Sequence, residues 1–303
     1  MWKIALLVVA ALLVGGLAVA HLLYRQAASE AEAALEAVAA RAKPSMGRFE
    51  MGMVAGLPEV AQRYFAHAIQ PGTPLLTTVK LRMQGTFLLG NRDAYQSYDL
   101  EAVQVLAPPA EFVWVPTMRS GLLTISGSDG MVQGEGWTRF WVLGLAPVVN
   151  QGASADLNRS AMTRAAMEAV WAPASLLPAN GATWEQIGPN TARVTVPIGA
   201  QPIEITLGPS GEVIEMVSMR WSNENPDKTF RLQPFGGTVE AEAVFGGFTI
   251  PSRLKIGNHF GADQYLPFFQ VDIVDASYLS NHFPFAGGAP MRAAKLLSGG
   301  CFH

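Results

Sequence analysis

The sequence predicts a mainly β protein of the α+β class, in which a curved antiparallel sheet or half-barrel carries a few covering helices and follows one N-terminal transmembrane helix. Two patterns predict this: an uncharged apolar run opens the chain, and apolar residues alternate with polar ones in several later segments. The composition agrees, because 50% of the 303 residues are hydrophobic and 15% are charged. Such a chain has material for a large core and too little charge for disorder.

The opening apolar run covers residues 4–23 and contains no charged side chain. As a helix, about 20 residues span the roughly 30 Å of bilayer hydrocarbon. Trp2 and Tyr24 flank the run, where aromatic rings favour the membrane interface. The small residues Ala18 and Ala20 also fit a signal-peptidase site. This segment is therefore either a retained anchor, which we favour, or a cleaved signal sequence.

The side of the membrane on which the body lies is predicted indirectly. Basic residues stand on both sides of the span, at Lys3 before it and at Arg25 and Arg41 after it, so the positive-inside rule does not decide. The signal-like N-terminus and the scarcity of lysine and cysteine favour export. Cys301 is the single cysteine, which excludes an intrachain disulfide. We expect a single-pass protein of the bacterial inner membrane with a periplasmic domain.

Three segments follow the span. The predicted boundaries are residues 1–25 for the anchor or signal segment, 26–56 for a helical stalk and linker, 57–280 for a β-rich globular domain and 281–303 for a C-terminal tail. Residues 27–42 are rich in alanine, with glutamates early and Arg41 late, an order that complements a helix dipole. Pro44 ends this helix, and the tail is expected to contain a short helix at residues 291–297.

The globular domain is predicted to begin with a short amphipathic helix at residues 57–69, after which strands dominate. Apolar and polar residues alternate with period two in residues 79–84, 192–196, 203–207 and 239–245. This alternation is typical of antiparallel strands with one exposed face.

Three segments depart from simple alternation. Residues 112–115 are apolar on both faces, so we expect that strand to be covered on both sides. Within residues 95–106 the apolar phase switches, which predicts a bulge. Residues 126–130, Ser-Gly-Ser-Asp-Gly, have the composition of a turn.

A helix is expected to cover the concave side of the sheet. In residues 154–170, Leu157, Ala161 and Ala165 recur at helical spacing among polar residues. Pro173 stops this helix, and the Leu-Leu-Pro of residues 176–178 continues it as an apolar plug. Helix and plug together are expected to form a lid over an apolar concavity.

The candidate ligand-binding residues are large aromatic, apolar and charged side chains of the sheet and this lid. They are Trp114, Trp141, Arg159, Arg164, Glu168, Trp171, Leu176, Leu177 and Phe235. Arginines beside an apolar pocket suit an anionic headgroup, and tryptophans suit a cavity lining. Two alternatives stay open: Arg164 and Glu168, four residues apart, also suit an ordinary helix surface, and each tryptophan suits ordinary core packing.

No catalytic residue, metal ligand or cofactor site is predicted. The five histidines lack paired spacing, although Cys301 and His303 are near enough in sequence to share an ion. No phosphate-binding loop or dinucleotide fingerprint occurs. The net charge of −3 provides no basic field for nucleic acid. We expect a protein without catalytic activity, with an unrecognised hydrolase as an alternative.

Several phrases resemble an uncharacterised bacterial family of membrane-anchored proteins, a domain of unknown function. They include RSAMTRAAMEAVWAPASLLP at residues 159–178 and FGGFTIPSR at residues 245–253, within a likeness that covers residues 57–279. The Gly-Gly-x-x-Ile-Pro pattern of the second phrase also resembles periplasmic lipoprotein carriers and related lipid-binding half-barrels. That resemblance implies a curved antiparallel sheet whose helices close an apolar concavity.

The expected function is therefore that of a membrane-anchored extracytoplasmic domain that binds an apolar or lipid-like ligand. The alternative is an accessory or structural subunit that docks onto a larger membrane protein complex. Its expected partners are the membrane, through the N-terminal span, and either such a ligand or such a complex, whereas nucleic acid is not expected.

Overall fold

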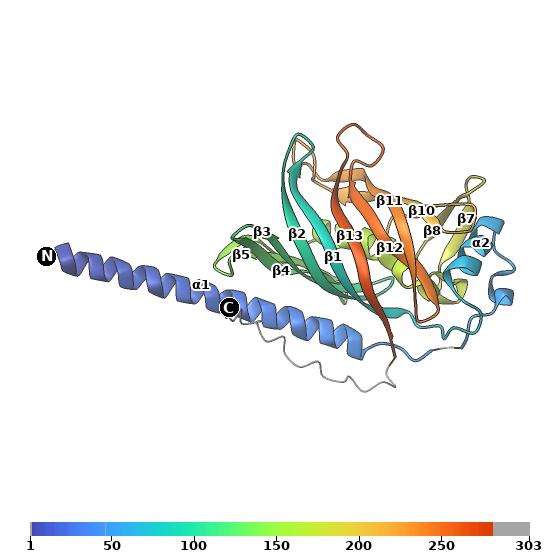
Figure 1. Ribbon diagram of the computed structural model, residues 1–303, viewed down its shortest axis with the longest axis horizontal. Helices are drawn as coiled ribbons and strands as arrows, with labels where there is room; N and C mark the ends of the chain where they lie inside the picture. The colour runs from blue at the N-terminus through green and yellow to red at the C-terminus, as the bar shows by residue number, and fades with distance from the viewer. Residues whose placement is uncertain (1, 46, 281–303) are drawn as a thin grey trace, which may run out of the picture.

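The computed structural model describes residues 2–45 and 47–280. Their main feature is one curved antiparallel sheet of thirteen strands with three α-helices around it (Figure 1). The sheet does not close on itself, because β6 and β7 are its two edges. The predicted fold class, a curved antiparallel sheet with covering helices behind an apolar N-terminal helix, is confirmed.

The helices and strands have the following bounds. The α-helices are α1 (Trp2–Ala40), α2 (Glu59–Ala68) and α3 (Ala155–Met167). The strands are β1 (Thr78–Asn91), β2 (Ala94–Ala107), β3 (Glu111–Ser120), β4 (Leu123–Val132), β5 (Glu135–Val142), β6 (Ala146–Gln151), β7 (Thr183–Gln186), β8 (Thr191–Thr195), β9 (Ile203–Leu207), β10 (Val213–Ser222), β11 (Arg231–Phe245), β12 (Phe248–Asn258) and β13 (Leu266–Leu279). Short 3-10 helices occupy Met51–Val54, Glu168–Trp171, Pro173–Leu176 and Pro178–Asn180.

The strands form two meanders that meet where β1 pairs with β13. The sheet order is β6-β5-β4-β3-β2-β1-β13-β12-β11-β10-β9-β8-β7, so every other pair consists of sequence neighbours. Tight turns join several of these neighbours, as at Gly246 and Gly247 between β11 and β12, whereas longer loops at residues 196–202, 223–230 and 259–265 join β8 to β9, β10 to β11 and β12 to β13. The edges β6 and β7 are adjacent in sequence order but lie at opposite ends of the sheet order, and the chain between them contains α3.

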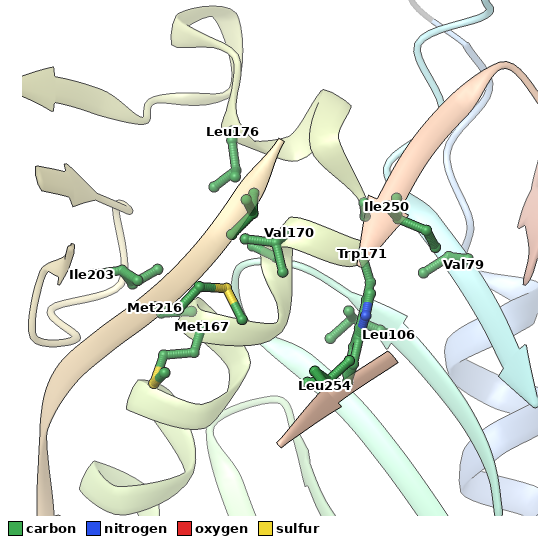
Figure 2. Packing of buried hydrophobic residues seen from close by; sticks show 14 of the residues in the cluster. Val79, Leu106, Met167, Val170, Trp171, Leu176, Ile203, Met216, Ile250 and Leu254 are labelled. Atoms are coloured by element: carbon green, nitrogen blue, oxygen red, sulfur yellow. The ribbon is translucent and has the colours of Figure 1, made fainter. Parts of the chain in front are cut away.

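The chain between β6 and β7 supplies the helix and plug that were expected on the concave side. Ser154 caps α3, because its side chain accepts a hydrogen bond of 3.1 Å from the backbone nitrogen of Leu157. After α3, the 3-10 helices bury Trp171 and Leu176 within the main core. Figure 2 shows Trp171 beside the strand residues Leu106 and Leu254. The plug is therefore part of the core.

The opposite end of the concave side is covered by α2. Its apolar face buries Val60, Tyr64 and Phe65, and the rings of Tyr64 and Phe65 each lie 5.2 Å from the ring of Trp184 in β7. The amphipathic helix predicted at residues 57–69 is thus confirmed, and it begins directly after Pro58.

The C-terminal half of α1 packs on the convex face of the sheet. Leu35 and Val38 form a second apolar cluster there with Val105 of β2 and Val113 of β3. Strand β2 pairs with β1 and β3 without a register shift, so the predicted bulge is wrong. The change of apolar phase arises because α1 covers the second face of β2. The prediction that residues 112–115 are covered on both sides is confirmed.

The predicted turn at residues 126–130 is also wrong, because these residues lie inside β4. Their glycines serve close packing. A Cβ atom on Gly127 would lie 1.9 Å from the carbonyl oxygen of Arg139, and one on Gly130 would lie 2.5 Å from the ring of Trp137. Small residues are therefore required within this strand by its neighbour β5.

The N-terminal half of α1 is apolar and exposed. Its most apolar 18-residue window has a mean hydropathy of 2.6, and none of that window is buried. The helix is long and apolar enough to cross a membrane. It continues without a break into the stalk predicted at residues 27–42 and ends before Pro44.

Candidate functional site

A large open cavity lies between the concave face of the sheet and α3. Its volume is about 1990 Å³, and its lining comes from α3 and from strands of both meanders. Sites for drug-sized ligands typically have volumes of about 300–1,000 Å³. The cavity is therefore large enough for a ligand longer than a typical small metabolite.

The floor of the cavity is a continuous cluster of aromatic rings. It contains Phe87 of β1, Trp114 of β3, Phe140 of β5, Phe235 of β11, and Phe268 and Phe269 of β13. Neighbouring ring centroids in this cluster are 5.3 to 6.5 Å apart, the range of favourable aromatic contacts. Trp114 and Phe235 are buried, whereas the other four rings are half-buried. The floor thus offers apolar surface to a ligand.

One wall of the cavity carries a compact ion triad centred on Arg164 of α3. The Nη1 of Arg164 donates to Oδ2 of Asp129 at 2.5 Å, and its Nε donates to Oε1 of Glu168 at 2.6 Å. The three side chains are 12%, 20% and 12% exposed, respectively. Burial by itself lowers the pKa of Arg164, but the two carboxylates reverse this and hold its pKa above the ordinary value. The arginine is therefore a permanent cation neutralised within the wall.

Further polar side chains complete the bonding of this triad. The amide nitrogen of Gln104 donates to Oε2 of Glu168 at 2.5 Å, and the hydroxyl of Thr138 donates to Oδ1 of Asp129 at 2.8 Å. All four carboxylate oxygens therefore accept a hydrogen bond from the protein. The Arg164 guanidinium also lies over the ring of Trp114, 5.1 Å from its centroid, so the charged wall directly adjoins the aromatic floor.

A second arginine, Arg220 of β10, lines the cavity beside this triad. Its Nε donates to the hydroxyl of Ser160 at 3.0 Å, and its guanidinium lies 4.7 Å from the ring centroid of Phe235. In the part of the chain that the structure describes, no carboxylate lies within ion-pair distance of it. Burial and the Arg164 charge lower the pKa of Arg220, yet arginine stays protonated in proteins.

The structure brings five of the nine predicted site residues to the cavity. Trp114, Arg164, Glu168, Trp171 and Phe235 are in its lining. The indole nitrogen of Trp171 donates to the carbonyl of Pro251 at 3.0 Å, so most of that side chain serves the core.

The other four predicted residues lie outside the cavity lining. Trp141 is on the convex side, where its ring centroid is 5.9 Å from that of Tyr24 in α1. Arg159 is exposed and lies over the ring of Trp221, 4.0 Å from its centroid. Leu176 and Leu177 are core residues, because the chain turns inward after α3 instead of crossing the cavity mouth.

Sequence reasoning missed three polar residues of the site: Asp129, Gln104 and Arg220. Asp129 lies in a segment whose composition predicts a turn, and Gln104 lies where the alternation of apolar residues changes phase, so neither is predicted to face the cavity. A signal for Gln104 existed, since it continues the period-two series of Tyr98 and Leu100 that faces the core. Nothing in the sequence indicated that Arg220 would lie beside α3.

The described residues contain no group of three or more His, Cys, Asp or Glu side chains arranged to hold a metal ion. They also contain no serine, threonine or cysteine hydrogen-bonded to a histidine. Cys301 and His303, which are near enough in sequence to share an ion, and the short helix expected at residues 291–297 lie outside the described residues.

Comparisons with known proteins identify a family and a weak similarity to solved structures. A family model described as "Family of unknown function (DUF6544)" matches residues 47–271. Among solved structures, the chain is similar to the crystal structure of a LolA superfamily protein from Nitrosomonas europaea, with 11% sequence identity and a TM-score of 0.37. That alignment covers 74% of this chain and 91% of the other. No curated protein sequence matches the chain.

Proposed function

The chain belongs to the DUF6544 family of unknown function, and we propose that it is a membrane-anchored domain that binds an apolar or lipid-like ligand in its cavity without catalysing a reaction. The aromatic floor of a cavity of about 1990 Å³ carries this proposal. An exposed apolar surface of this kind in a concave site is typical of ligand-binding sites. The charged side chains of the wall form hydrogen bonds with one another, and the described residues of the wall include no nucleophile paired with a base.

We propose that the full chain is organised as an anchor at residues 1–25, a stalk and linker at residues 26–56, a binding domain at residues 57–280 and a tail at residues 281–303. The anchor is retained in this proposal, because the packed stalk is the continuation of the same helix. The body then lies on the periplasmic side of the inner membrane, supported by the signal-like character of the segment.

The contacts of α1 set the position of the domain relative to the bilayer. The apolar run ends at Leu23, and the hydroxyl of the next residue, Tyr24, accepts a hydrogen bond of 3.1 Å from the hydroxyl of Ser126 of β4. Farther along α1, Glu30 forms an ion pair with Arg139 of β5, the antiparallel neighbour of β4. From Ser126, β4 runs back in the opposite direction along α1, to the turn between β3 and β4. The β3–β4 turn therefore points towards the N-terminal, membrane side of α1, and its Leu122 is 97% exposed.

This geometry predicts that Leu122 enters the bilayer interface. A Leu122→Cys variant in a Cys301→Ser background, labelled with an environment-sensitive fluorophore and placed in liposomes, is expected to be quenched by nitroxide-labelled lipids. The matched control is Ser210→Cys in the turn between β9 and β10, beside α2, which should be unquenched. The same control should react with an impermeant maleimide in intact spheroplasts. Equal quenching at both positions, or no labelling at position 210, would contradict the proposed placement.

Ligand binding is tested by native mass spectrometry of the full chain purified in detergent. We expect bound lipid in the unmodified protein and at least about tenfold less after Phe268→Asp, because a carboxylate in the aromatic floor would have to be desolvated when ligand binds. The control Val244→Asp introduces the same carboxylate at a side chain that is 56% exposed on β11 and outside the lining, and it should retain lipid.

Two outcomes would contradict the proposed function. Absence of lipid together with a stoichiometric protein partner would support the accessory-subunit alternative. Equal lipid content in the Phe268→Asp and Val244→Asp variants would show that the lipid is held elsewhere, for example around the exposed part of α1.

A further inference from the structure

We propose that the cavity selects amphiphiles with an acidic headgroup, carboxylate or phosphate, and that the Arg220 guanidinium binds this headgroup while the aromatic floor holds the chain. This inference rests on the proposed function and names the ligand class of the same cavity. The two arginines singled out in the sequence, Arg159 and Arg164, do not fill this role, because one lies outside the lining and the other is bonded within the triad.

Arg220 is a half-buried cation of the cavity that retains donor capacity, whereas the other arginine and lysine side chains of the lining outside the triad, Arg92, Lys228 and Arg231, are exposed. Guanidinium carries five N–H donors, and in the described structure only the Nε donor of Arg220 has a hydrogen-bond acceptor, the hydroxyl of Ser160. That bond fixes the orientation of the planar group and leaves both Nη atoms for an incoming acceptor. Paired N–H groups of this kind match the two oxygens of a carboxylate or phosphate.

The nearby carboxylates do not substitute for a ligand. Asp129 and Glu168 exceed Arg164 by one negative charge, and their field favours the protonated form of Arg220. Their four oxygens, however, already accept bonds from Arg164, Gln104 and Thr138. The wall therefore has surplus donors. The adjoining floor adds another donor, because the indole nitrogen of Trp114 is buried without a hydrogen-bond partner in the described residues.

The surroundings of Arg220 combine the two chemistries of an amphiphile. Its guanidinium lies over Phe235, which belongs to the aromatic floor and is 6.3 Å from Phe268 between ring centroids. When the headgroup of an amphiphile binds Arg220, its hydrocarbon chain would therefore lie directly over these rings. A charge-assisted hydrogen bond gains strength in such a partly desolvated place, so an acid should bind better than a neutral molecule of equal length.

The test compares decanoate with 1-decanol on the full chain in nanodiscs, by calorimetric titration with empty nanodiscs subtracted. We expect decanoate to bind about tenfold or more tightly than decanol, and decyl phosphate to behave like decanoate. In Arg220→Gln, the affinity for decanoate should fall to the affinity for decanol, while the affinity for decanol stays unchanged. Arg159→Gln, which removes an exposed cation of α3 outside the lining, should preserve the preference.

Three results would overturn the inference, and each is distinct. Equal affinities of decanoate and decanol for the unmodified protein would remove the headgroup site while leaving the binding function intact, and this comparison requires no variant to fold. Inorganic phosphate binding as tightly as decyl phosphate would indicate a site for free anions. If neither decanoate nor decanol bound more than it binds to empty nanodiscs, the proposed function itself would be contradicted.

Discussion

Replacing Arg164 with methionine is expected to lower the free energy of unfolding by about 3–5 kcal/mol, because it leaves two half-buried carboxylates next to each other without their shared cation. Asp129 and Glu168 would lose their charge-assisted hydrogen bonds from Arg164, at 2.5 and 2.6 Å, respectively. For a domain of this size the melting temperature should fall by roughly 10 °C. Thermal unfolding followed by circular dichroism in detergent measures the change.

The matched controls separate the loss of a cation from the loss of a side chain. Arg159→Met removes an exposed arginine from the same helix and should change the stability by no more than about 0.5 kcal/mol. Combining Arg164→Met with Asp129→Asn and Glu168→Gln removes the unpaired charges, and it should recover most of the loss. If Arg164→Met melted at the same temperature as Arg159→Met, the triad would have no structural role.

The sheet was predictable from the sequence because most of its strands have one polar face. Period-two alternation in segments such as residues 203–207 identifies such strands, and glycine turns separate them. The pattern fails in β2 and β3, where α1 and the main core cover opposite faces. With apolar residues on both faces, alternation carries no information on which face is concave. The same ambiguity holds in β5, where the neighbouring aromatic residues Phe140 and Trp141 lie on opposite faces. The sequence therefore assigns both Trp114 and Trp141 to the cavity, although only Trp114 faces it.

The charged wall was only partly predictable, for a different reason. Arg164 and Glu168 form a local pair that helix spacing reveals. Asp129 and Arg220 come from β4 and β10, which are far apart in the sheet order and meet only across α3. Their proximity depends on how far the sheet curves. Local sequence patterns do not specify that curvature, and the strand glycines that permit it resemble turn residues.

Replacing Gly237 with alanine tests that dependence, and it is expected to cost about 3 kcal/mol or more, at the upper end of overpacking effects. A Cβ atom there would lie 1.7 Å from the carbonyl oxygen of Lys255 on β12. Backbone atoms cannot rotate away as a side chain can, so the pairing of β11 with β12 must open. Thermal unfolding measures the loss, and Gly52→Ala, which has no neighbouring atom within 4 Å, should be nearly neutral.

The same substitution connects the curvature of the sheet to the cavity. Gly237 lies two residues after Phe235, and in the register of β11 and β12 it faces Ile256, which also lines the cavity. Separating the two strands would move part of the lining away from β13, so Gly237→Ala should also reduce lipid retention at temperatures where the domain remains folded. A variant that melts like the unmodified protein would mean that the close approach of these strands is not needed for the curvature. Reduced stability with unchanged lipid content would show that the cavity tolerates a wider sheet than the one described.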